Sequence, residues 1–418
     1  MILTLLLLQL TVILVTARLC GLALRALGQP MVIGEMAAGI VLGPVVLGQL
    51  APQWHQQLFP PASLQGLSAL ANVGVVLFMF IVGTELRTPE GSKERGKPFG
   101  AAGWVAGLGM LLPMALGITI APALHESLAP PGVRFWPFAL FMGVALSITA
   151  FPVLARIQKD KGLSGTRIGQ LSLAAAGMVD ASAWLLLALV IAFASAGAGL
   201  EGFLRIALGL PLMLAVIFLL IRPLLARLLR THAPDGRPTA MMLAALVIGV
   251  FASAMFTEWL HLHAVFGAFL FGIALPRDDR LSHALRERIE PLSVVMLMPI
   301  FFAMAGLGTS PGAFGNAALG MLVLIVLAAS VGKIAGAAAG ARMGGYGWPE
   351  SLAIGALMNS RGLMELIAIK VGLDAGLIGP ELFTMLLAMA LITTAATTPL
   401  LSLIARYRPA AVDRVALP

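Results

Sequence analysis

Apolar runs about as long as a membrane-spanning helix follow one another along almost the whole chain, separated by short segments rich in glycine, proline or charge. A helix needs about 20 predominantly apolar residues to cross a bilayer. The pattern therefore predicts an all-α integral membrane protein with about 13 transmembrane helices. The predicted spans are residues 2–26, 31–50, 66–86, 99–123, 135–157, 168–196, 202–228, 238–257, 261–276, 289–308, 315–341, 349–373 and 381–406.

The composition excludes a soluble enzyme, because only 11% of the 418 residues are charged and 59% are hydrophobic. A soluble domain carries about 25% charged residues. The longest polar run, residues 87–98, is too short to fold by itself. We therefore expect residues 1–418 to form a single membrane domain without a soluble regulatory domain. Because the sequence carries no nucleotide loop, zinc-protease motif or nucleophile elbow, we expect neither an enzyme nor a cofactor.

The distribution of lysine and arginine predicts the orientation. Loops that follow odd-numbered spans and the C-terminal tail hold 16 of the 27 basic residues, whereas only Arg134 and Arg205 lie in or next to the loops after even-numbered spans. Since short cytoplasmic loops are enriched in basic residues, we expect an N-terminus outside and a C-terminus in the cytoplasm of a bacterial inner membrane. The same rule accounts for the net charge of +8 without a nucleic-acid partner.

Two of the predicted spans are interrupted by polar residues. The span 135–157 carries Ser147, Thr149 and Pro152, and the span 349–373 carries the run Asn359-Ser360-Arg361-Gly362. A charge inside the bilayer costs several kcal/mol, which favours a functional role for the interruption that contains Arg361. The two spans lie an odd number of crossings apart, so they have opposite topology. This is typical of inverted-repeat transporters, whose sites form between unwound helices at the midplane.

Asp180 lies near the centre of the span 168–196 and is the main candidate for chemistry. A carboxylate at that depth binds either a proton or a cation, or pairs with a basic group. Lys333 lies among glycines and alanines, which allow another helix to approach closely. We expect an ion pair between Lys333 and Asp180; a purely structural pairing is the alternative.

The interruptions supply the other candidate site residues. Ser147 and Thr149 offer hydroxyl oxygens on one side, and Asn359 and Ser360 offer oxygens on the other. Hard alkali cations prefer such oxygen ligands. Arg361 and Glu365 are four residues apart, so they either pair on one helix face or compensate the ends of half-helices. No transition-metal site is predicted, because His261 and His263 are two residues apart and lack a completing ligand set.

The chain resembles the monovalent cation:proton antiporter-2 family, and within it the bacterial relatives of plant CHX-type cation/proton exchangers. The resemblance runs in order through nearly the whole chain. It rests on the segments QPMVIGEMAAGIVLGP, VLFMFIVGTELR, ALSITAFPVLAR, HAVFGAFLFGIALP, MPIFFAMAGLGT, VGKIAGAAAG, MNSRGLMELIAIKVG and LITTAATTPLL, together with the segment around Asp180.

The resemblance implies a homodimer of thirteen-helix subunits in which two discontinuous helices cross. It implies core helices at about residues 99–196 and 315–406 and dimerisation or scaffold helices at about 1–86 and 202–308. It also implies exchange of K⁺ or Na⁺ for protons by an elevator-like movement. Asp180 matches the essential carboxylate of the family, Lys333 matches its basic residue, and Ser147 and Thr149 match the hydroxyls of the first crossing helix.

Two departures from the family pattern matter. Family members carry a polar residue directly before the essential aspartate, whereas this chain has Val179. A single carboxylate favours one proton per cation and electroneutral exchange. Many relatives also append a nucleotide-binding domain, whereas this sequence stops at Pro418, so we expect no regulation by nucleotide through this polypeptide.

The hypothesis from the sequence is a homodimeric antiporter in the lipid bilayer that serves pH homeostasis and exchanges K⁺ or Na⁺ for H⁺ at Asp180. One alternative is an organic-anion symporter of the same crossed-helix type, with Arg361 and half-helix N-termini holding a carboxylate. The other alternative is an ion-sensing membrane protein that does not transport.

Overall fold

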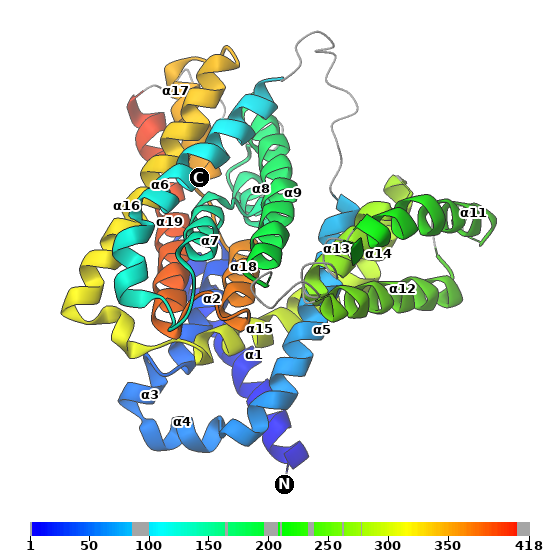
Figure 1. The fold of residues 1–418 in the computed structure, drawn as a ribbon, viewed down its shortest axis with the longest axis horizontal. Helices are drawn as coiled ribbons and strands as arrows, with labels where there is room; N and C mark the ends of the chain where they lie inside the picture. The colour runs from blue at the N-terminus through cyan, green and yellow to red at the C-terminus, as the bar shows by residue number, and fades with distance from the viewer. Residues whose placement is uncertain are drawn as a thin grey trace. The chain divides into compact units, whose positions relative to one another are not determined.

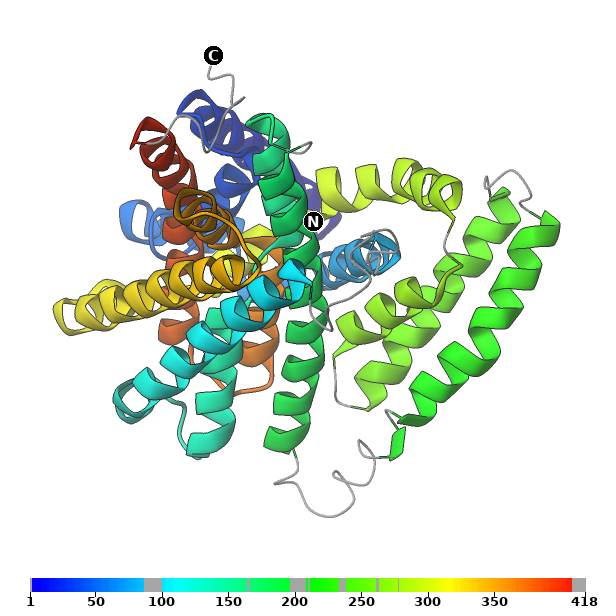
Figure 2. The same cartoon turned by 90° about the horizontal axis from the view of Figure 1, so that it is seen from above.

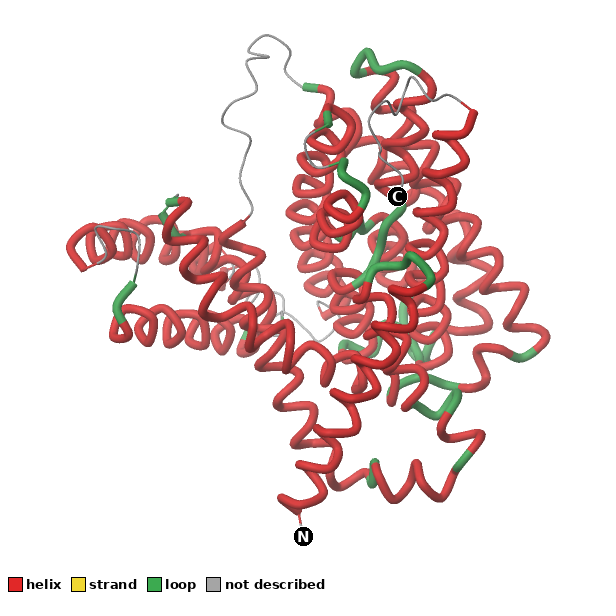
Figure 3. Tube along the Cα trace, turned by 180° about the vertical axis from the view of Figure 1, so that it is seen from behind, coloured by secondary structure: helices red, strands yellow, loops and turns green. Residues whose placement is uncertain are grey.

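The computed structural model describes residues 2–85, 100–163, 166–195, 208–209, 211–232, 238–260, 263–276 and 278–407. Helices make up nearly all of these residues, and no strand occurs among them (Figure 3). The predicted all-α class is therefore confirmed.

Ten of the described helices are long and apolar enough to cross a membrane. The bent pair α17 (Trp348–Met358) and α18 (Leu363–Asp374), with 48° between its halves, adds an eleventh crossing. The two remaining predicted spans correspond to shorter apolar helices, α7 (Phe135–Ser147) and α13 (Ala264–Ala274). Each of the thirteen predicted spans thus corresponds to at least one helix, although the beginning of the span 202–228 and His261 lie outside the described residues.

Some boundaries differ from those predicted. The third span begins at Pro61 rather than at residue 66, and the helical segment predicted to begin at residue 289 already begins at Asp279. It runs through three elements, α14 (Asp279–Glu290), the π-helix η3 (Pro291–Leu297) and α15 (Met298–Leu307). Pro291 cannot donate to the carbonyl four residues earlier, and this agrees with the wider turn that begins there.

The chain divides into two compact units. The first unit comprises Met1–Leu14, Gln56–Arg87 and Ile191–Met304, and the second comprises Val15–His55, Thr88–Val190 and Ala305–Pro418. The helices α1 (Ile2–Ala26), α4 (Pro52–Leu58), α9 (Arg167–Ser195) and α15 contribute to both.

The first unit also contains α5 (Pro61–Glu85), the π-helix η2 (Val216–Ile221), α11 (Arg222–His232) and α12 (Ala240–Trp259). The helices α12 and α13 lie side by side (Figure 2). Their backbones approach closely at Gly267, whose carbonyl accepts a 2.8 Å hydrogen bond from the hydroxyl of Ser253. The amide of Gly267 in turn donates to the hydroxyl of Thr257 at 3.1 Å. These buried hydroxyls connect two otherwise apolar helices.

The remaining elements of the second unit are α2 (Met31–Leu42), α3 (Leu47–Leu50), α6 (Ala101–Leu128), α8 (Phe151–Asp160), the 3₁₀-helix η4 (Pro311–Phe314), α16 (Asn316–Met343) and α19 (Pro380–Tyr407). The helices α6 and α16 lie against each other (Figure 1). A Cβ atom on Gly336 would lie 2.3 Å from the carbonyl oxygen of Leu108. The close approach predicted from the glycines and alanines around Lys333 is therefore confirmed.

A close helix contact in the second unit gives a direct stability prediction. A Cβ atom on Gly306 of α15 would lie 1.8 Å from the carbonyl oxygen of Gly39 of α2. We expect Gly306→Ala to destabilise the protein by about 1–3 kcal/mol, because overpacking forces the two backbones apart. Gly320→Ala in α16 is the matched control, since nothing lies within 4 Å of its added methyl group. Thermal unfolding of purified protein in detergent measures both variants, and equal melting temperatures would contradict the prediction.

Candidate functional site

Two broken helices cross inside the second unit. The first is α7 followed by α8, separated by residues 148–150, and the second is the bent pair α17 and α18. The hydroxyl of Thr149 donates to the carbonyl of Met358 at 3.1 Å. The amide of Ala150 donates to the carbonyl of Ser360 at 3.1 Å. Each break thus satisfies backbone groups of the other, and both predicted interruptions are confirmed.

Asp180 lies near the middle of α9 and is buried, with 1% of its surface exposed. Its Oδ2 atom accepts a 3.3 Å hydrogen bond from the amide of Phe151, the first residue of α8. A helix start carries partial positive charge, which stabilises a carboxylate beside it. The other oxygen, Oδ1, is buried and has no hydrogen-bond partner among the residues that the structure describes. Asp180 therefore keeps one oxygen unused.

Further unused oxygens belong to the second break. Asn359 Oδ1 and Ser360 Oγ are buried and have no hydrogen-bond partner in the described part of the chain. The amide nitrogen of the Asn359 side chain is held by the carbonyl of Thr393 at 3.4 Å. Buried polar atoms are almost always paired. Unpaired oxygens on Asp180 and on the second break are therefore a reason to expect a ligand, and oxygen atoms are the ligands that alkali cations prefer.

The predicted hydroxyls of the first break have partners of their own. The hydroxyl of Ser147 donates back to the carbonyl of Val144 at 2.8 Å, and the hydroxyl of Thr149 is directed to Met358. A hydroxyl that donates its proton retains lone pairs on its oxygen. Both oxygens can therefore still serve a cation.

Lys333 differs from its predicted contact. Its ammonium is fully buried and donates to the carbonyl of Gly109 at 2.9 Å and to the carbonyl of Ser147. The expected ion pair with Asp180 is absent from the described contacts of either residue. The physical reason is the break itself, because the last carbonyls of α7 lack helical partners and carry partial negative charge.

Arg361 and Glu365 form the buried ion pair that their spacing predicts, at 3.0 Å. Arg361 also donates to the carbonyls of Ala145 at 3.1 Å and Leu146 at 2.6 Å. Both readings from the sequence hold, since the arginine pairs with the glutamate and also compensates the end of α7. Because Lys333 donates to the carbonyl of Ser147, the two basic side chains together bond the three successive carbonyls of residues 145–147.

The sequence motif LITTAATTPLL contains a contact that the sequence alone did not assign. The hydroxyl of Thr394 in α19 accepts from the amide of Arg361 at 2.8 Å and lies 2.8 Å from its carbonyl oxygen. The sequence signal for this contact is the cluster of threonines in the apolar helix α19.

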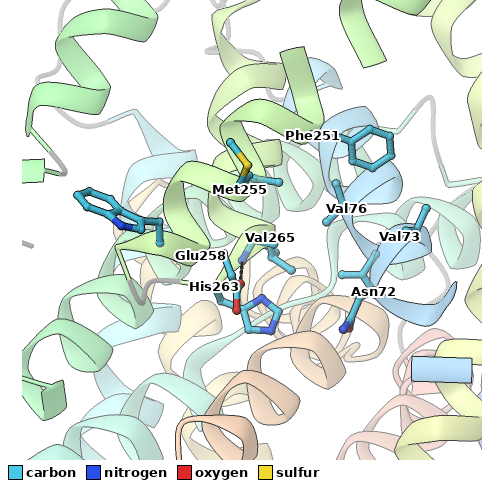
Figure 4. A pocket seen from close by; sticks show the side chains of 12 residues that line it. Asn72, Val73, Val76, Phe251, Met255, Glu258, His263 and Val265 are labelled. Atoms are coloured by element: carbon cyan, nitrogen blue, oxygen red, sulfur yellow. Dashed lines mark hydrogen bonds between the residues drawn. The ribbon is translucent and has the colours of Figure 1, made fainter. Parts of the chain in front are cut away.

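A separate cavity of about 540 Å³ lies in the first unit. Its walls are formed in part by Val73, Val76, Phe251 and Met255 (Figure 4). The carboxylate of Glu258 accepts a 2.7 Å hydrogen bond from the amide of Ala264, where α13 begins. Glu258 is exposed and is used to complete a helix start, so the crossing in the second unit remains the better candidate for ion chemistry.

Comparisons with known proteins agree with this geometry. The family model described as "Sodium/hydrogen exchanger, transmembrane" matches residues 12–405. The chain is 40% identical over 400 residues to the Na⁺/H⁺ antiporter NhaS4 of Synechocystis, covering 95% of this chain and 96% of the relative. It is 39% identical over 410 residues to cation/H⁺ antiporter 17 of Arabidopsis thaliana, covering 97% of this chain. The chain spans about half (49%) of the length of that plant relative.

A solved structure has the same fold. The sodium proton antiporter MjNhaP1 from Methanocaldococcus jannaschii superimposes with a TM-score of 0.61 at 13% sequence identity, covering 94% of this chain and 98% of that structure. At this identity the likeness concerns the fold alone.

Proposed function

The chain belongs to the sodium/hydrogen exchanger family of integral membrane proteins, and from this premise we propose that it exchanges a monovalent cation, K⁺ or Na⁺, for H⁺. The match covers nearly the whole chain, and the named relatives are cation/proton antiporters. The observation that carries the proposal is the buried carboxylate of Asp180, which has one oxygen free of hydrogen bonds beside two broken helices.

In the proposed mechanism, Asp180 binds the proton and the cation in turn. A buried charge without a neutralising partner is costly. A proton on the carboxylate removes the charge, and a cation at the free oxygen compensates it. Asn359, Ser360, Ser147 and Thr149 supply further oxygens toward the cation. Because one carboxylate serves both ions, binding of one requires release of the other.

The charges at the crossing support electroneutral exchange. Glu365 is paired with Arg361, so Asp180 is the carboxylate of the described crossing that is open to either ion, and the residue before it is the buried, apolar Val179. Loading the site with a proton or with a monovalent cation adds the same single positive charge. An exchange of one for the other therefore moves no net charge.

Alternating access is proposed to follow an elevator scheme. The second unit contains both broken helices and Asp180, so its movement as one body carries the bound ion. The loaded site moves more readily than the empty site, because the empty site keeps an uncompensated carboxylate, and this difference couples the two fluxes. The homodimer formed by scaffold helices and the outside position of the N-terminus belong to the same proposal.

The contacts of Arg361 argue against the organic-anion alternative. Its two terminal nitrogens are committed to Ala145, Leu146 and Glu365. Most donors of the guanidinium are therefore bonded to protein groups, and the one nitrogen without a hydrogen-bond partner among the described residues is the buried Nε.

Reconstituted protein tests the proposed function. We expect liposomes with a trapped pH dye and an imposed proton gradient to respond when K⁺ or Na⁺ is added. Li⁺ and Rb⁺ serve as comparison ions. Because the exchange is electroneutral, clamping the membrane potential with K⁺ and valinomycin should leave the rate unchanged within about twofold. No flux with any cation from folded protein would favour the ion-sensing alternative. Inhibition by a small organic acid but not by alkali cations would favour the symporter.

A further inference from the structure

We propose that Thr394 is a positioning residue for the ion site, because its hydroxyl holds the backbone of Arg361 where the second broken helix is interrupted. The inference rests on the proposed function of the crossing and extends it to a residue on a third helix, α19. In this proposal, Thr394 positions Asn359, Ser360 and the guanidinium of Arg361.

The hydroxyl of Thr394 makes an unusual set of contacts. It is buried, with 1% of its surface exposed, and its oxygen accepts from the amide of Arg361 at 2.8 Å. Its single proton has two acceptors, the carbonyl of Arg361 at 2.8 Å and the carbonyl of Ala390 in its own helix at 2.7 Å. One side chain thus serves both backbone groups of the same residue.

The broken helix needs this contact because its own hydrogen bonding stops at Arg361. The amides of Asn359 and Ser360 still donate to carbonyls of α17, and the amide of Leu366 is bonded to the carbonyl of Gly362 at the start of α18. The amide of Arg361 lies between these two ladders, and Thr394 is its partner. A buried amide without a partner is strongly disfavoured.

A shift of the Arg361 backbone would change the ion site on two sides. The preceding residues, Asn359 and Ser360, carry the unpaired oxygens, and the carbonyl of Ser360 accepts from Ala150 of the first break. The Arg361 side chain reaches the end of α7. Thr394 therefore fixes the oxygen ligands and the compensating charge together.

The neighbouring threonine provides a matched control. Thr397 lies three residues later on α19, is fully buried, and donates to the carbonyl of Thr393 in the same helix at 3.2 Å. Thr397→Val removes an equivalent hydroxyl that bonds within α19, and the Thr393 carbonyl that it releases still accepts from the side-chain amide of Asn359.

The test compares Thr394→Val, Thr394→Ser and Thr397→Val in liposomes and by cation-induced thermal stabilisation. For Thr394→Val we expect the KM for the cation to rise about tenfold, the effect of leaving one buried amide unsatisfied at the site. The maximal rate per folded protein should change less, and the thermal shift caused by the cation should shrink. Thr394→Ser and Thr397→Val should stay within about twofold of the wild type.

Three outcomes would overturn the inference: an unchanged KM in Thr394→Val, an equal effect of Thr397→Val, or a loss confined to the yield of folded protein. If Thr394→Val does not fold, Thr394→Cys carries the test, since a thiol is a weak acceptor and an unchanged KM there also contradicts the inference. Failure of the proposed function is distinguishable, because wild-type protein would then show no flux. The thermal shift caused by the cation then tests the role of Thr394. Loss of this shift in Thr394→Val supports the inference. A wild type that shows no shift, or a Thr394→Val variant that retains the shift, overturns the inference.

Discussion

Asp180→Asn is expected to abolish cation-dependent proton flux while the protein remains folded. Asparagine has nearly the shape of aspartate and can still accept from the amide of Phe151. It cannot release a proton or supply a negative charge, so both exchanged ions lose their shared ligand. We expect a reduction of about a hundredfold or more, the scale found when a group essential to a reaction is removed.

Stability should respond in the opposite way to activity. Asp180 is buried and the compensation of its charge is incomplete, so a neutral amide of the same size removes a desolvation cost. The melting temperature of Asp180→Asn should therefore equal or exceed that of the wild type. Liposome flux and thermal unfolding, measured on the same preparation, check both expectations.

The control for this experiment is Asp374→Asn. Asp374 also lies on a helix of the second unit, but 43% of its side chain is exposed and it pairs with Lys370. We expect this variant to retain flux. Flux retained in Asp180→Asn would remove Asp180 from the mechanism, and flux lost equally in Asp374→Asn would point to a general loss of charge or fold.

The helices and the breaks could be predicted because each leaves a mark in the local sequence. Apolar runs of membrane length predict spans, and Arg361 in the middle of such a run predicts an interruption, since an uncompensated charge there would be too costly. The pairing of Arg361 with Glu365 also followed from local spacing. These inferences need only neighbours along one helix.

The partner of Lys333 could not be predicted in the same way. The sequence offers Asp180 as an opposite charge, but it does not reveal that Gly109 of α6 and Ser147 at the end of α7 present their carbonyls to the ammonium. Thr394 was missed for a related reason, because its partner is a backbone amide 33 residues away. A contact to a backbone amide or carbonyl leaves no pattern in the residue types of the sequence.

The ends of the broken helices carry partial charges that charged side chains must compensate, and the same region forms the proposed ion site. The start of α8 carries partial positive charge and faces Asp180, whereas the end of α7 carries partial negative charge and faces Arg361 and Lys333. The two basic residues thereby neutralise the end of α7 and leave one oxygen of Asp180 open. A direct pair between Lys333 and Asp180 would occupy the group that the ions are proposed to share.

Arg361→Met is expected to destabilise the protein by about 3–5 kcal/mol, because it leaves Glu365 as a buried carboxylate without its partner. The carbonyls of Ala145 and Leu146 lose their donors in the same step. Methionine is similar in length and apolar, so lost volume contributes little. The measurement is the melting temperature or denaturant midpoint of purified protein in detergent.

The double variant Arg361→Met/Glu365→Leu separates the two contributions. Removing the unpaired carboxylate should recover part of the stability, since a buried ion pair replaced by apolar groups is often tolerated. Recovery should be incomplete, because the two carbonyls at the end of α7 still lack donors. Complete recovery would mean that Arg361 serves Glu365 alone and does not compensate α7.

The pair Lys370–Asp374 is the internal control, because it has the same four-residue spacing but lies within α18 with both side chains partly exposed. Surface pairs contribute between about 0 and 1 kcal/mol, so Lys370→Met should leave the melting temperature almost unchanged. A loss in Lys370→Met as large as that in Arg361→Met would show that removing either basic residue of this segment has the same effect. A loss confined to Arg361→Met would trace it to the buried contacts that join the two broken helices.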